Sequence, residues 1–143
     1  MAYKIDDRNK EIFAIVDNVI VPREKAVIPV WDSGFLHGKQ IWSSPRLING
    51  KIFRLLDHLE KIRHGIIAMG FGGKRLPENE VFIDAIRKVL VTNKMQGASG
   101  VHIRIIYTPG SQVTASMNKK AIVNFDGTPS PYRIIVIPEW RGE

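Results

Sequence analysis

Short apolar runs separated by turn residues open the chain, a pattern typical of antiparallel strands. Residues 12–16 and 19–21 are rich in β-branched side chains and are separated by Asp17-Asn18. A two-residue connection of this type between apolar runs predicts a β-hairpin. Asn49-Gly50 is a second turn dipeptide and leads into a further apolar segment, 51–53. The first third of the chain therefore predicts antiparallel strands.

Further strands are expected on the same grounds. We expect one over residues 26–30, and a turn at 32–34 that leads into extended chain from Phe35 to Leu47. Residues 101–108 alternate apolar and more polar side chains, which is the period of a strand with one buried face. Residues 132–138 supply a last apolar strand.

The hydrophobic period changes to that of a helix after residue 54. Apolar side chains recur between Leu55 and Ile66 at i, i+4, i+7 and i+11, which places them on one helical stripe. Pro77 suits the first turn of a second helix, whose apolar pairs recur every four residues as far as Leu90. Together the segments predict an α+β fold, an antiparallel sheet packed against two helices.

The length of 143 residues suits one compact domain. We expect that domain to cover residues 1–131. Residues 132–143 are then the start of an interdomain connection, or of a second domain that is otherwise absent.

The net charge of +7 is compatible with a nucleic acid, an anionic substrate or a phosphate cofactor. Basic residues are spread from Lys4 to Arg141 without a Lys/Arg block, and they are not interleaved with base-stacking aromatics, so nucleic-acid binding is not expected. The chain has no cysteine, which excludes disulfides and agrees with a cytoplasmic location. No apolar run approaches the ~20 residues that a membrane span requires.

Several motifs stand in a fixed order along most of the chain. They are Val21-Pro22, Asp32-x-Gly34-Phe35-Leu36-x-Gly38, Trp42, Asn49-Gly50-Lys51, Phe53-Arg54-Leu55 with His58-Leu59, and His102-Ile103-Arg104. This order resembles the N-terminal domain of the class IV aminotransferases. These are fold type IV enzymes dependent on pyridoxal 5'-phosphate, and they include branched-chain, D-amino-acid and (R)-selective amine transaminases.

The resemblance implies a cofactor-binding residue, Arg54. In the family, the arginine of the Phe-Arg-Leu motif binds the phosphate of the cofactor, and a guanidinium presents a rigid fork of donors that suits a phosphate. The alternative is a surface arginine paired with Asp57.

Three further residues are implied at the substrate side of the pocket. His37 stands where related enzymes place an aromatic residue or histidine near the substrate carboxylate, and Trp42 stands where they place an aromatic residue beside the cofactor. Arg104 matches an arginine that some members direct at a substrate carboxylate. The alternatives are core packing for Trp42 and a cross-strand ion pair for Arg104. His58 is interpreted as structural.

The catalytic lysine of the family belongs to a second domain, so the resemblance implies no catalytic residue in this chain. It implies a transaminase that moves an amino group between an amino acid or amine and a 2-oxo acid, and that works as a homodimer. These 143 residues alone are expected to be inactive. The other hypothesis is a truncated, non-catalytic relative that serves as a dimerisation or interaction module.

Overall fold

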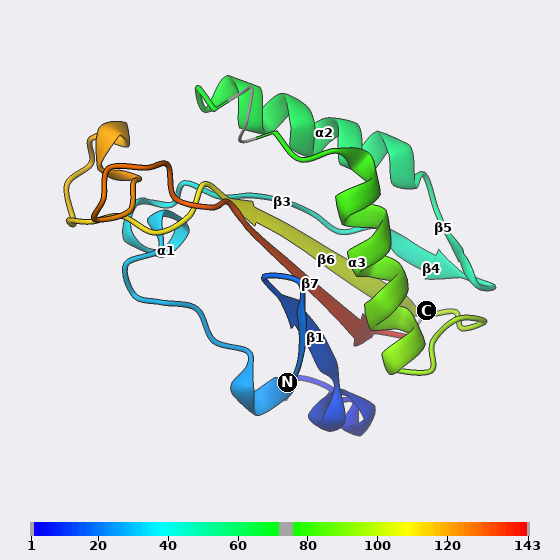
Figure 1. Cartoon of the computed structure of the whole chain (residues 1–143). Helices are drawn as coiled ribbons and strands as arrows, with labels where there is room; N and C mark the ends of the chain where they lie inside the picture. Colours follow the sequence, from blue (N-terminus) through cyan, green and yellow to red (C-terminus); the bar gives the residue numbers. More distant parts are fainter. Residues whose placement is uncertain (1, 72–75, 143) are drawn as a thin grey trace.

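The centre of the computed structural model, which describes residues 2–71 and 76–142, is an antiparallel sheet of seven strands (Figure 1). The strands run in the order β2-β1-β7-β6-β4-β5, and β3 also pairs with β6. Their bounds are β1 Phe13–Val16, β2 Val19–Pro22, β3 Ile41–Ser43, β4 Arg46–Ile48, β5 Lys51–Ile52, β6 Val101–Thr108 and β7 Arg133–Trp140. The helices are α1 Ser33–His37, α2 Leu55–Ala68 and α3 Asn79–Thr92, with short 3-10 helices η1 Asp7–Glu11, η2 Arg23–Lys25 and η4 Lys119–Ala121. The predicted α+β fold is confirmed.

Both hairpins predicted from the turn dipeptides are present. Asp17 and Asn18 have φ values of 52° and 67°, and they connect β1 to β2. Asn49 and Gly50 have φ values of 50° and 74°, and they connect β4 to β5. Positive φ at both central residues is the requirement of the type I′ turn, which Asn, Asp and Gly meet at least cost.

Helices α2 and α3 lie over one face of the sheet and enclose the core (Figure 1). The residues of β6 that face them, Val101, Ile103, Ile105 and Tyr107, are fully buried, whereas the alternate residues are more exposed except for Thr108 at the end of the strand. The helical stripe predicted between Leu55 and Ile66 supplies the facing side chains of α2. The second helix begins at Asn79, two residues later than the position of Pro77 suggested.

The segment from Phe35 to Leu47 is only partly extended, which corrects the prediction. Its first residues belong to the short helix α1, because the Asp32 side chain accepts a hydrogen bond from the Gly34 N–H and caps the helix. The remainder forms β3 and β4, which share one register against β6 and are interrupted at Pro45, a residue with no N–H for the ladder.

The strand expected over residues 26–30 is also wrong. This segment is irregular and largely exposed, and it follows η2 directly. Its apolar side chains therefore have no sheet neighbour to cover them, and Pro29 offers no N–H for a ladder.

Residues 133–140 lie inside the sheet rather than in a connection that leaves it. As strand β7 they pair with β6 along their whole length, and Ile135 and Val136 also pair with β1. A boundary after residue 131 would lie directly before this strand. Pro138, unusual inside a sheet, lies beyond the residues that pair with β1.

A buried carboxylate joins α1 to the ends of β6 and β7. Asp32 has no exposed surface, and its Oδ1 accepts hydrogen bonds from the hydroxyl of Thr108 at 2.8 Å and from Nη1 of Arg133 at 3.3 Å. The Nε of Arg133 also donates to Asp17 in the β1–β2 turn. One acidic side chain thus fixes the N-terminus of α1 against two central strands.

None of the helices in the described ranges, 2–71 and 76–142, combines the length and hydropathy that crossing a bilayer requires.

The packing around Asp32 gives a test of this network. A Cβ at Gly34 would lie 2.6 Å from Cγ2 of Thr108 and 2.8 Å from Oδ2 of Asp32, so Gly34→Ala should lower the free energy of unfolding by about 1–3 kcal/mol. Urea denaturation measures this. Gly97→Ala is the control, because no atom lies within 4 Å of its added Cβ. Equal stabilities of the two variants would contradict this account.

Candidate functional site

Arg54 lies at the junction between β5 and α2. It adopts a left-handed backbone conformation, with φ 52° and ψ 42°, as the residue that precedes the first turn of α2. The N–H of Phe53 donates to the carbonyl of Arg46 at 2.9 Å, which fixes the junction to the sheet. The Arg54 side chain is 66% exposed, and its Nε donates to Oδ2 of Asp57 at 2.7 Å.

The pairing with Asp57 is the alternative that the sequence left open for Arg54. Both side chains are about two-thirds exposed. An exposed ion pair of this kind contributes about 0–1 kcal/mol because solvent screens it. The guanidinium therefore remains available to an anion that binds it more strongly than a surface carboxylate does.

Trp42 and Arg104 lie together on the face of the sheet opposite α2 and α3. Trp42 pairs with Ile106, which places its side chain on the same face as that of Arg104. The guanidinium carbon of Arg104 lies 4.1 Å from the centroid of the Trp42 ring. Trp42 is 53% exposed, so it is not a core residue, and Arg104 makes a cation–π contact instead of the cross-strand ion pair.

A groove lies beside this pair. Its volume is about 350 Å³, and it lies between α1 and the adjoining ends of β6 and β7. Its walls are mostly apolar and include Phe35, Ile106 and Ile135, while Gln40 is an exposed polar residue of the lining. Because Ile106 is the register partner of Trp42, the Trp42–Arg104 pair adjoins the groove.

His37 and Arg54 do not join the Trp42–Arg104 pair. His37 is half-buried at the C-terminal end of α1, and its Nε2 lies 3.1 Å from the carbonyl oxygen of Ser116. Next to it, Lys39 Nζ donates to the carbonyl of Met117 at 3.1 Å. These two contacts hold the segment after β6 against α1.

The proteins to which this chain is similar include branched-chain aminotransferases and aminotransferase-like proteins. No protein-family model matches the chain. The curated branched-chain-amino-acid aminotransferase-like protein 2 of Arabidopsis thaliana is 34% identical over 133 residues, which is 93% of this chain and 22% of that protein. The chain resembles these aminotransferase-like proteins over most of its length, and it has the fold of the N-terminal domain of the fold type IV branched-chain aminotransferases.

Solved structures agree in fold. The branched-chain aminotransferase of Thermoproteus uzoniensis, solved with norvaline, superposes with a TM-score of 0.73 at 16% identity, over 93% of this chain and 42% of that one. A T.th. branched-chain amino acid aminotransferase with pyridoxamine 5'-phosphate gives a TM-score of 0.69 at 19% identity, over 94% and 41%. The chain thus spans less than half of each relative, so the activity of the whole protein remains a proposal.

Two interactions of this domain were not predicted from its sequence. One is the Asp32–Thr108–Arg133 network. The sequence did contain a sign of it. Asp32 directly before Ser33 is a typical N-cap, and Gly38 is a typical C-cap, so the two together predict a short capped helix. The other joins Ser43 of β3 to the Nδ1 of His58 in the first turns of α2. This bond supports the structural interpretation of His58.

Burial lowers the pKa of His58 below its ordinary value, Lys61 and Arg54 lower it further, and Asp57 partly opposes them. The folded domain thus favours the neutral imidazole beside Ser43. The unfolded chain binds more protons between the lowered pKa of the folded state and the ordinary value of 6.5, so a fall in pH through that window destabilises the fold.

The free energy of unfolding should therefore decrease from about pH 7.5 to about pH 5.5, and His58→Gln should make this slope shallower. Urea denaturation at several pH values measures the slope. His102 has a pKa lowered mainly by burial and will retain part of the slope in the variant. An identical slope in His58→Gln and the unaltered chain would exclude His58 as a contributor.

Proposed function

We propose that this domain supplies the phosphate ligand of the cofactor and one wall of the substrate pocket in a pyridoxal-phosphate-dependent aminotransferase. The enzyme would move an amino group between an amino acid or amine and a 2-oxo acid. The observation that carries the proposal is the position of Arg54, an exposed guanidinium at a sheet-to-helix junction whose partner is a surface carboxylate.

The chemistry of Arg54 fits a phosphate ester. A guanidinium offers parallel donors to phosphate oxygens, and a hydrogen bond that involves a charged group contributes about 1.5–3 kcal/mol, more than an exposed ion pair. Asp57 would have to yield the Nε donor when a phosphate binds. The Ser43–His58 bond and the Phe53–Arg46 bond would hold the junction in place during that exchange.

The open face of the sheet fits the substrate side of the pocket. Trp42 would lie against the cofactor or the substrate, and Arg104 would turn from the Trp42 ring to the substrate carboxylate. The apolar groove beside them would receive an aliphatic side chain, and a solved relative is a branched-chain aminotransferase with norvaline. We assign His37 to the same side of the pocket, where its contact with Ser116 positions the loop after β6.

The cofactor, when bound, supplies an electron sink for the chemistry at the amino carbon. The residues of this chain would bind and orient the cofactor and its substrate. The lysine that holds the cofactor and moves the proton belongs, by resemblance, to a second domain after this one. We therefore expect no turnover from this domain by itself.

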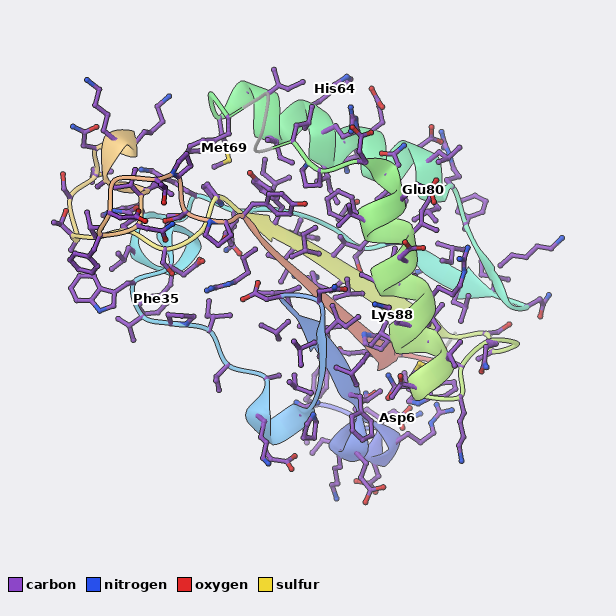
Figure 2. All side chains as sticks on the ribbon, in the orientation of Figure 1. Asp6, Phe35, His64, Met69, Glu80 and Lys88 are labelled. Atoms are coloured by element: carbon purple, nitrogen blue, oxygen red, sulfur yellow. The ribbon has the colours of Figure 1, made fainter. Side chains whose placement is uncertain are left out.

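An exposed apolar segment favours association with a second copy. Val27, Val30, Trp31 and Phe35 are 52–72% exposed and lie close together in sequence before and within α1. Phe35 lies at the margin of the molecule (Figure 2). A cluster of this kind is typical of an interface. The same surface would serve the non-catalytic alternative, a dimerisation or interaction module. We propose a homodimer that places this segment at the interface.

Binding of pyridoxamine 5'-phosphate tests the role of Arg54. This probe cannot form an imine with surface lysines, and pyridoxamine without the phosphate is its matched comparison. Isothermal titration calorimetry should show tighter binding of the phosphorylated compound, and Arg54→Ala should weaken it about tenfold or more. Lys61→Ala, which removes another exposed cation of α2, is the control. Equal affinities of the unaltered chain and Arg54→Ala would contradict the assignment.

Sedimentation velocity without cofactor tests the interface. The double substitution Trp31→Ser and Phe35→Ser should weaken self-association more than tenfold, because burial of each aromatic side chain contributes about 1.5–3 kcal/mol. Phe125→Ser, which removes a 94% exposed aromatic elsewhere, should leave self-association unchanged. A chain that stays monomeric at all concentrations would refute the homodimer, and a dimer that ignores pyridoxamine 5'-phosphate would favour the non-catalytic module.

A further inference from the structure

A second concavity lies on the helix-covered side of the sheet, away from the groove. Its volume is about 490 Å³, and it is bounded by α3, the β1–β2 turn and the start of β7. The apolar residues Ile15, Ala85 and Ile134 line its inner part and are at most 6% exposed. Cavities of this size commonly bind small molecules.

Four charged residues also line this cleft, and two of them, Asp17 and Arg133, form an ion pair with each other. Nε of Arg133 donates to both oxygens of Asp17, at 3.1 and 2.9 Å, and its Nη1 reaches the buried Asp32. The other two, Asp84 and Lys88, make weaker contacts. Asp84 lies 3.7 Å from Arg87, with both side chains more than 60% exposed, and Lys88 Nζ donates to the neutral Asn18 at 3.4 Å.

Asp84 and Lys88 stand one helical turn apart on α3. Side chains at i and i+4 lie on one face of a helix, with Cβ atoms about 5–6 Å apart. A carboxylate and an ammonium group are therefore presented side by side at the edge of an apolar cavity. A free amino acid carries the complementary ammonium and carboxylate on one carbon atom.

We propose that this cleft binds an α-amino acid with an aliphatic side chain, as the zwitterion. Asp84 binds its ammonium group, Lys88 binds its carboxylate, and the side chain packs against Ile15, Ala85 and Ile134. This site does not depend on the aminotransferase proposal. Ile134 faces the helices, whereas its neighbour Ile135 lines the groove on the opposite face of the sheet.

Titration of the ¹⁵N-labelled chain with L-leucine, followed by NMR, tests the site. Saturable shifts are expected at the amides of Ile15, Asn18, Ala85 and Lys88. The amides of Trp42 and Ile106 report binding in the groove instead, so the two proposals are tested separately in one experiment. Shifts confined to the groove would overturn the cleft site and leave the other proposal standing.

Two analogues isolate the charges of the ligand. 4-Methylpentanoate lacks the ammonium group of leucine, and 3-methylbutylamine lacks its carboxylate. Each should bind about tenfold more weakly than leucine if both charges are recognised. Equal binding of leucine and either analogue would contradict recognition of the zwitterion.

Single substitutions on α3 isolate the charges of the protein. Asp84→Asn and Lys88→Gln should each weaken the binding of leucine about fivefold or more. Two controls remove a charge outside the cleft. Glu80→Gln removes a carboxylate from the same helix (Figure 2), and Lys61→Gln removes an exposed cation from α2. Both variants should bind leucine as tightly as the unaltered chain does. Since all four positions are exposed, circular dichroism should confirm intact folds. Equal losses in the variants and their controls would overturn the proposal.

Discussion

The buried carboxylate of Asp32 is the constraint on which the placement of the groove depends. It has no exposed surface and three donors, the N–H of Gly34, the hydroxyl of Thr108 and a guanidinium N–H of Arg133. Removal of one partner from a buried ion pair lowers the free energy of unfolding by about 3–5 kcal/mol, because the remaining charge stays buried without a partner. The start of α1, the end of β6 and the start of β7 are therefore fixed to one another. These three elements bound the groove, so its shape depends on this contact.

The candidate binding residues are held in a different way. Arg54 and Arg104 are exposed, and their partners, Asp57 and the Trp42 ring, are exposed too. An exposed ion pair or cation–π contact contributes about 1 kcal/mol or less. The guanidinium groups can therefore exchange these partners for a phosphate or carboxylate at small cost, whereas the sheet that carries them is held by buried side chains. A stable sheet with weakly paired cations on its open face is a suitable arrangement for an anionic ligand.

Local patterns predicted the parts of this fold that local chemistry determines. Asp17-Asn18 and Asn49-Gly50 specify their turns by backbone conformation, and the apolar stripe of α2 specifies its buried face. The position of β7 could not be predicted in this way, because a strand is placed by partners that are distant in sequence. The candidate site also has a part that local sequence predicts and a part that it does not. The Phe-Arg-Leu motif singled out Arg54 as a candidate, whereas the stacking of Arg104 on Trp42 depends on the register between β3 and β6.

Arg133 belongs to both sides of the sheet. Its Nε contacts Asp17, which lines the cleft beside α3, and its Nη1 contacts Asp32, which lines the groove on the opposite face. The Arg133 side chain is only 12% exposed and Asp32 is buried, whereas Asp17 is 43% exposed, so solvent screens the contact with Asp17 more than the contact with Asp32. A guanidinium presents its donors in a rigid planar fork, so one side chain binds both carboxylates at once. The two concavities of this domain thus have one positively charged group in common, which lies between a carboxylate of the cleft and a carboxylate of the groove.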